Sequence, residues 1–315
     1  MWTIIEKIFP YAIAYTVPML LTALGALYSE RSGIINIGLD GLMIIGSFAG
    51  AITASKLQAN GVPGALWIGL LAAFLAGVLF SILHAFASIN LNADQTISGT
   101  AINMMAGALT VFLARNITGS GNIRVTNGFL PTDVPVLSKL PIIGPLFFER
   151  AYPTTWLAII ILALSVFLLY KTAFGLRLRA CGEHPEAVAA AGVNVYKMRY
   201  FGVLASGGLA ALGGATMLLT YSGEFNGNVA GLGFLSLAAL IFGQWRPLGI
   251  LGATFFFGFA STIANVSQAI PALSEIPGIL LKTFPYIVTL IALVFFSKSS
   301  RAPKAEGQPF DPGKR

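Results

Sequence analysis

Three polar residues in otherwise apolar sequence are the main candidates for chemistry: Asn36, Asp40 and Asn103. Asp40 is the one acidic residue expected within a membrane-crossing stretch, where an ionisable group is costly and commonly functional. Asn36 precedes Asp40 by four residues, so the two share a helical face if the stretch is helical there. Asp40 could line a pathway and meet a hydroxylated substrate. Alternatively, it could accept hydrogen bonds from backbone N–H groups that an interrupted helix leaves free.

The motifs of common enzymatic and ATP-binding sites do not occur in the sequence. It contains no G-x-x-x-x-G-K-[ST] phosphate loop, no H-E-x-x-H motif and no carboxylate pair within a predicted span. The two histidines, His84 and His184, are far apart, and the single Cys181 excludes an internal disulfide or a cysteine-based metal cluster. We therefore expect no catalytic residue, no metal and no cofactor. Any ATP hydrolysis must belong to a separate polypeptide.

The composition predicts an all-α protein that crosses a membrane repeatedly. Of the 315 residues, 56% are hydrophobic and 10% charged, whereas a soluble domain has about 25% charged residues. Several apolar runs approach the ~20 residues that a helix needs to cross the hydrocarbon core. We expect nine spans, at about 8–28, 34–55, 64–89, 96–115, 154–170, 200–221, 230–244, 248–265 and 280–297. Residues 1–297 would form one transmembrane domain, in which the spans at 34–55 and 230–244 are short or interrupted.

Lysine and arginine indicate how the chain is oriented. Basic residues gather in the segment 171–199 and in the tail 298–315. Because cytoplasmic loops are enriched in these residues, we expect both segments, and the C-terminus, inside a bacterial cytoplasmic membrane. This asymmetry accounts for the net charge of +7 without nucleic-acid binding. The proline-rich segment 116–153 is then an external loop, and Trp245 is expected to be an interfacial anchor.

Two parts of the chain follow one plan, which predicts an internal repeat. In the first part YSERSGIINIG precedes DGLMIIGSFAGAI, and in the second TYSGEFNGNVAG precedes LGFLSLAALIFGQW. The units, about 8–115 and 200–297, would hold four spans each, and the connecting span 154–170 makes them inverted relative to each other. Inverted repeats with interrupted helices are typical of transporters. The AGLGF stretch of the second unit has no acid to match Asp40, so we favour a structural role for that carboxylate.

Two motifs, GIINIGLDGLMIIGSFAGA and FGLRLRACGEHPEAVAAAGVNVYKMRYFGVLASGGLAALGGA, carry a family resemblance. They resemble the membrane permease subunits of bacterial ATP-binding-cassette (ABC) importers. The branch includes transporters of ribose and other simple sugars, nucleosides and branched-chain amino acids. The resemblance covers the chain from about Pro18 to Phe296. The form SERSGIINIGLDG looks most like permeases of nucleoside importers that work with basic-membrane-protein-type binding lipoproteins.

The resemblance implies that the segment 171–199 contains a coupling helix, which sits in a groove of the ATPase subunit. By resemblance, its positions are occupied by Gly182, Glu183, Pro185, Ala187, Ala190 and Gly192. The residues themselves predict a short helix, since Pro185 suits a first turn and Gly192 suits a C-cap. Small side chains fit a narrow groove. The alternative is an interfacial helix on the lipid surface, but such helices usually carry bulky apolar residues.

The expectation that follows is a permease subunit forming half of the pathway of an ABC importer for a nucleoside or a simple sugar. The implied partners are an ABC ATPase subunit, a second permease subunit and a substrate-binding lipoprotein on the outer face. We expect the second permease subunit to be a different chain, and the alternative is a second copy of this chain. One alternative is an ion-driven secondary transporter, in which inverted repeats look alike. Another is an ABC permease for branched-chain amino acids.

Overall fold

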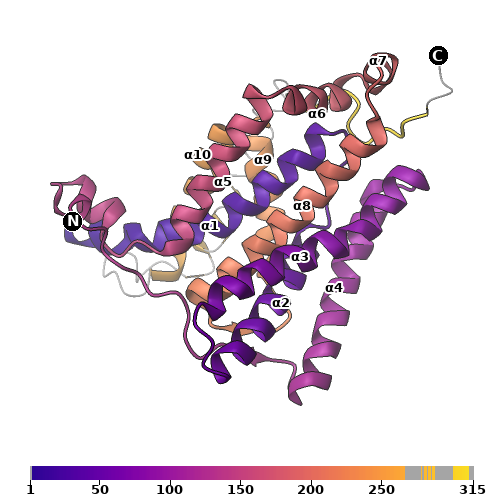
Figure 1. Ribbon diagram of the computed structural model, residues 1–315. Helices are drawn as coiled ribbons and strands as arrows, with labels where there is room; N and C mark the ends of the chain where they lie inside the picture. The colour runs from indigo at the N-terminus through magenta and orange to yellow at the C-terminus, as the bar shows by residue number, and fades with distance from the viewer. Residues whose placement is uncertain are drawn as a thin grey trace.

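A computed structural model describes residues 2–266, 278, 280, 281, 283, 284, 286, 287 and 301–311. The described residues are mostly helical, and they include one pair of very short strands (Figure 1). The α-helices are α1 (Trp2–Arg31), α2 (Leu39–Ala59), α3 (Ala65–Ala85), α4 (Gln95–Thr118), α5 (Pro153–Lys171), α6 (Ala173–Glu183), α7 (Pro185–Ala190), α8 (Val195–Met217), α9 (Leu232–Phe242) and α10 (Pro247–Val266). The shorter elements are η1 (Phe86–Asn90), β1 (Ile123–Arg124), η2 (Leu137–Lys139), η3 (Gly144–Phe148), η4 (Leu218–Ser222) and β2 (Glu224–Phe225).

Seven helical stretches among the described residues are long and apolar enough to cross a membrane. They are Ile8–Arg31, Leu39–Ala59, Ala65–Asn90, Gln95–Thr118, Pro153–Lys171, Val195–Ser222 and Pro247–Asn265. Each matches a predicted span, so the chain is a multi-pass membrane protein.

The prediction of nine full spans is not confirmed. The predicted span 230–244 is α9, whose 11 residues reach only about 16 Å as a helix, roughly half of the hydrocarbon core. The predicted span 280–297 lies outside the described residues except at single positions. The predicted span 34–55 starts later, because α2 begins only at Leu39.

Two helices form the centre of the bundle. In an apolar 18-residue stretch of each helix, 78% of the residues in α1 and 89% of those in α8 are buried. The corresponding share is 28% in each of α3, α4 and α5. Helix α8 packs against α1, α2 and α3, while α1 packs against α8, α9 and α10. The approach is close, since a side chain at Gly46 of α2 would overlap the backbone of Ala211 in α8. Large apolar side chains such as Leu79 and Leu164 point away from the bundle and suit a lipid environment.

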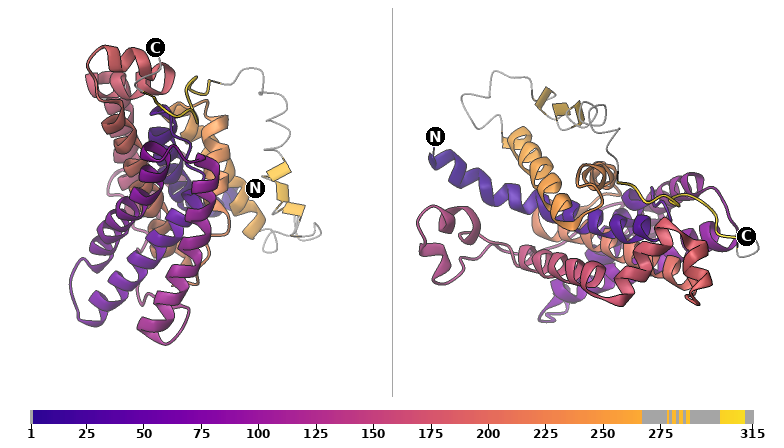
Figure 2. Two further views of the ribbon diagram at one scale, coloured as in Figure 1. Left: turned by 90° about the vertical axis from the view of Figure 1, so that its right-hand side faces the viewer. Right: turned by 90° about the horizontal axis from the view of Figure 1, so that it is seen from above.

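Two contacts tie distant loops to the bundle. Strand β1, in the predicted external loop, pairs antiparallel with β2, with Arg124 opposite Glu224. Their side chains form an ion pair at 3.0 Å. At the opposite end of the molecule, the segment 301–311 runs beside α6 and α7 (yellow in Figures 1 and 2). The two ends of the bundle are thus covered by different parts of the chain.

Candidate functional site

The chain between α1 and α2 is not helical, and side chains satisfy its buried backbone groups. Asn36 is 1% exposed. Its Oδ1 accepts from the backbone N–H of Gly38 at 3.1 Å, and its Nδ2 donates to Ser206 Oγ of α8 at 2.9 Å. An unpaired polar group buried at this depth costs several kcal/mol. Asn36 therefore stabilises the interruption and attaches it to the central helix α8.

Asn103 of α4 bridges the two sides of the same interruption. Its Oδ1 accepts from the N–H of Gly41, in the first turn of α2, at 2.7 Å. Its Nδ2 donates to the carbonyl of Ile37 at 3.0 Å. The side-chain amide of Asn103 thus pairs with a backbone N–H at the start of α2 and with a backbone carbonyl just before α2.

Asp40 lies in the first turn of α2 and faces the start of α9. One of its carboxylate oxygens, Oδ1, accepts from the backbone N–H of Gly233 at 3.0 Å. A side chain at Gly233 would collide with the backbone of Asp40, so the two helix N-termini are in direct contact. Negative charge is favourable at a helix N-terminus because the free N–H groups and the helix dipole point toward it.

The three predicted residues therefore lie around one interruption, and two further residues complete it. Ile35 donates its N–H to Gln95 Oε1 at 2.7 Å, and its carbonyl lies 3.0 Å from His84 Nε2. His84 Nδ1 is 2.9 Å from Ser98 Oγ. The sequence offers no clear signal for these roles, since Gln95 occurs in an ordinary polar turn and His84 near the end of a span.

The predicted short helix is present as α7, and its predicted ends are confirmed. Pro185 occupies the first turn. Gly192 has φ +79°, and its N–H donates to the carbonyl of Ala189 at 2.9 Å. Val193 N–H donates to the carbonyl of Val188 at 3.2 Å. These two bonds form a Schellman motif, for which a glycine suits the left-handed position.

Beside α7 lies a cluster formed by the end of α1, the end of α9 and α6. Trp245 is 5% exposed, and its Nε1 donates to Glu30 Oε2 at 2.5 Å. Arg31 donates through Nη2 to the carbonyl of Trp245 at 2.8 Å and pairs with Glu183 at 3.7 Å. The prediction of an interfacial anchor at Trp245 is wrong, because the indole is buried against a carboxylate. Sequence reasoning also missed Glu30, whose only signal was its place beside Arg31.

The segment 301–311 is packed against this cluster and against α6. Ala305 N–H donates to the carbonyl of Gly182 at 2.8 Å, and Gly307 N–H donates to the carbonyl of Gly33 at 3.1 Å. Phe310 is 6% exposed, and its ring centroid lies 5.5 Å from that of Tyr196. Burial raises the pKa of Glu306, although a hydrogen bond with Glu30 and the charge of Arg31 lower it. This part of the predicted basic tail is thus a folded strap.

Comparison with known proteins identifies the family. Residues 9–294 match the family model described as the branched-chain amino acid transport system / permease component. The chain belongs to this permease family. It is 45% identical to the guanosine ABC transporter permease protein NupQ of Bacillus subtilis, over 99% of this chain and 98% of NupQ. It is 42% identical to the nucleoside ABC transporter permease protein NupC of Lactococcus lactis, over 94% and 93%.

A more distant relative is also named as a nucleoside permease. The nucleoside ABC transporter permease protein NupB, also of Lactococcus lactis, is 25% identical over 92% of this chain and 83% of its own length. Among solved structures, an inward-facing conformation of an ABC transporter of the metal-chelate type aligns with 91% of this chain and covers 85% of its own length, at 17% identity and a TM-score of 0.49.

Within this permease, the six positions assigned by resemblance to the coupling helix fall into two groups. Ala187, Ala190 and Gly192 are exposed and present no bulky side chain. Gly182 and Pro185 are buried, and Glu183 is half-buried in its ion pair with Arg31. The exposed group adds only small side chains to the surface of α7, whereas the other group attaches α7 to the permease. Among the described residues, no group of three or more His, Cys, Asp or Glu could hold a metal ion.

Proposed function

We propose that this chain is a permease subunit of an ABC importer that takes up nucleosides. The observation that carries the proposal is its similarity, over nearly the full length, to permeases named for guanosine and nucleoside transport. As the sequence contains no phosphate loop, a separate ABC ATPase must supply the energy. The chain forms part of the transmembrane pathway and is not itself an enzyme.

The exposed surface of α7 is the proposed contact with the ATPase. Ala187, Ala190 and Gly192 leave room for a close-fitting groove, and Val188 on the buried side packs with Val195 at the start of α8. Glu183, just before α7, pairs with Arg31 at the end of α1. A displacement of α7 therefore acts on both central helices, which could switch access by a rigid-body movement.

We also propose that the spans form two inverted repeats, about 8–115 and 200–297, joined by the span 154–170. The reciprocal packing of the central helices supports this arrangement. Helix α1 of the first unit packs on α9 and α10 of the second, and α8 of the second packs on α2 and α3 of the first. The interrupted helices α2 and α9 meet at their N-termini, as expected near the centre of such a transporter.

The remaining partners follow from this function. A second, different permease subunit would complete the pathway, and the occurrence of both NupB and NupC in one Lactococcus strain supports two distinct chains. A binding lipoprotein would deliver the nucleoside to the face that carries β1 and β2. The protein would lie in a bacterial cytoplasmic membrane, with α7 and the C-terminal strap on the cytoplasmic side.

Uptake by cells that carry the complete transporter tests the proposal. Deleting this chain should abolish ATP-dependent uptake of radiolabelled guanosine or uridine, and the intact chain should restore it. Unlabelled nucleosides should compete, whereas leucine and glucose should not. Uptake that survives ATP depletion but is lost with the ion gradient would indicate a secondary transporter. Competition by leucine alone would indicate an amino acid permease.

A further inference from the structure

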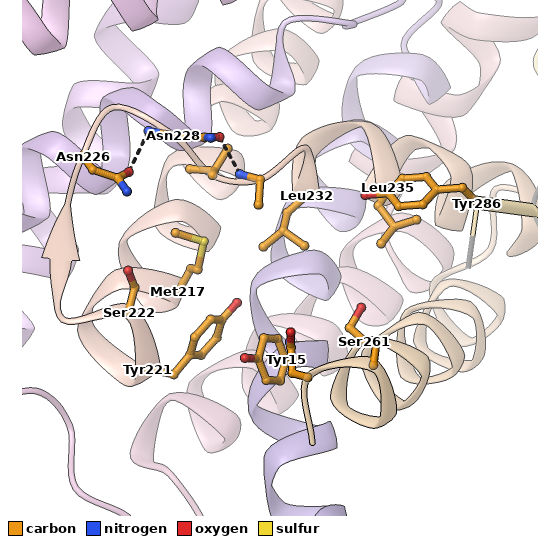
Figure 3. A pocket seen from close by; sticks show the side chains of 14 residues that line it. Tyr15, Met217, Tyr221, Ser222, Asn226, Asn228, Leu232, Leu235, Ser261 and Tyr286 are labelled. Carbon is orange, nitrogen blue, oxygen red and sulfur yellow. Dashed lines mark hydrogen bonds between the residues drawn. The ribbon is translucent and has the colours of Figure 1, made fainter. Parts of the chain in front are cut away.

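A cavity of about 580 Å³ lies between α1, the end of α8, α9 and α10 (Figure 3). Its volume is within the range of ~300–1,000 Å³ that is usual for small-molecule sites. Its lining includes Met217 and Leu235 in the bundle and the exposed loop residues Asn226 and Asn228. The cavity therefore extends from the loop between α8 and α9 into the apolar interior.

The described lining of this cavity is polar in places but carries no charged side chain. Among the described residues, the polar side chains that line it are hydroxyls and amides only: Tyr15, Tyr221, Ser222, Asn226, Asn228, Ser261, Asn265 and Tyr286. Asn226 Oδ1 accepts from the N–H of Asn228, and Asn228 Oδ1 accepts from the N–H of Ala230. Within the part of the chain that the structure describes, neither side-chain NH₂ group has an acceptor, so both can donate to a ligand. Such a lining suits a neutral ligand that has several hydrogen-bonding groups.

Two tyrosines form the deeper wall. The ring centroids of Tyr15 and Tyr221 are 4.4 Å apart at an interplanar angle of 39°, and Figure 3 shows the rings side by side with Tyr286 apart from them. The Tyr221 hydroxyl is buried and has no hydrogen-bond partner among the described residues. An unsatisfied buried hydroxyl costs about 1–3 kcal/mol. A ligand group that bonds this hydroxyl would remove the penalty.

We propose that this cavity binds the nucleobase of a nucleoside during its passage through the permease. The proposal rests on the function proposed above. A planar base offers its π face to the tyrosine rings, and such stacking contributes about 1–3 kcal/mol per base in single-stranded nucleic acid. The edge of the base carries the donors and acceptors that the Tyr221 hydroxyl and the asparagine amides can pair with. The ribose hydroxyls suit the remaining polar lining.

Photolabelling tests where the base binds. The assembled transporter in membrane vesicles is irradiated with 8-azidoguanosine or 5-iodouridine, and labelled peptides are mapped by mass spectrometry. Label is expected in the peptides that contain Tyr15 and Tyr221, and excess guanosine or uridine should prevent it. Equal protection by ribose would overturn the assignment to the base. Label confined to other peptides would overturn the site.

Paired substitutions on α1 supply a matched control. Tyr15 lines the cavity, whereas Tyr11, one turn earlier on the same helix, is 47% exposed and does not. Tyr15→Leu and Tyr221→Leu should each raise the half-saturating nucleoside concentration for uptake about tenfold, which corresponds to 1.4 kcal/mol. Tyr11→Leu should leave it within twofold. Tyr221→Phe, which retains the ring, should have a smaller effect than Tyr221→Leu.

The experiment separates failure of this inference from failure of the function. If the unsubstituted transporter takes up no nucleoside, the proposed function is wrong. If it takes up nucleosides while Tyr15→Leu and Tyr221→Leu behave like Tyr11→Leu, only the cavity assignment is wrong. Thermal unfolding of each purified variant identifies a substitution that acts through folding. In that case the photolabelling of the unsubstituted transporter decides whether the base binds in this cavity.

Discussion

The backbone N–H of Gly233 donates to the Asp40 carboxylate across 3.0 Å, and this bond joins two helices from separate parts of the chain. Asp40 lies in the first turn of α2, and Gly233 lies in the first turn of α9. Both helices follow an interruption, so both begin with free N–H groups within the bundle. One carboxylate thus stabilises the first turn of its own helix and that of its counterpart.

Replacing Asp40 should distinguish a structural role from a role in the pathway. Asp40→Ala leaves the Gly233 N–H without an acceptor and should lower the free energy of unfolding by about 1–3 kcal/mol. Asp40→Asn keeps an acceptor oxygen and should lose less. Thermal unfolding of the purified variants measures the difference. If both variants are as stable as the unsubstituted protein but have lost uptake, Asp40 instead lies in the pathway.

A bulky residue on the exposed side of α7 should uncouple the transporter. Ala190 is exposed, so Ala190→Trp should fold normally but abolish uptake and the substrate-stimulated ATPase activity of the complex. Ala163→Trp is the matched control, because Ala163 is exposed on α5, next to Leu164, which points away from the bundle. Normal uptake by Ala190→Trp would refute the contact between α7 and the ATPase.

Features that depend on neighbouring residues were predictable from the sequence. A membrane helix satisfies its own backbone groups, so hydropathy located the seven long spans among the described residues, although it also predicted a full span at the short helix α9. The ends of α7 likewise depend on local chemistry, with Pro185 in the first turn and Gly192 in the left-handed position. In both cases the interactions that decide the structure lie within a few residues.

Features that depend on distant partners were not predictable. Trp245 resembles an interfacial anchor in sequence, yet its indole is buried and donates a hydrogen bond to Glu30, 215 residues away. Asp40 is bonded to a backbone group 193 residues away. The cavity wall of Tyr15 and Tyr221 joins α1 to the end of α8. No pattern along the chain specifies such pairs.

The bond between Trp245 and Glu30 should contribute measurably to stability. Trp245→Phe removes the donor and leaves a buried carboxylate with one partner fewer, which should lower the free energy of unfolding by about 1.5–3 kcal/mol. Trp67→Phe is the control, because Trp67 is 48% exposed and packs edge-to-face on Phe129. Glu30→Gln in the Trp245→Phe background should recover part of the loss. Additive losses in this double-mutant cycle would show that the two side chains are not coupled.

The C-terminal strap should protect the single cysteine. Cys181 is buried in a cluster with Val188, Val195 and Phe310, and burial raises the pKa of its thiol to about 11. Because only the thiolate reacts, roughly one molecule in a thousand is reactive at pH 8, and labelling by a maleimide should rise about tenfold per pH unit up to the pKa. Phe310→Ala opens the cluster, so it should lower this pKa toward its ordinary value and accelerate labelling at pH 8.

Phe86→Ala, at a 51% exposed position, is the control and should leave the labelling of Cys181 unchanged. Rapid labelling of the unsubstituted protein at pH 8 would contradict the packed strap, since the reagent reaches Cys181 only where the cluster opens.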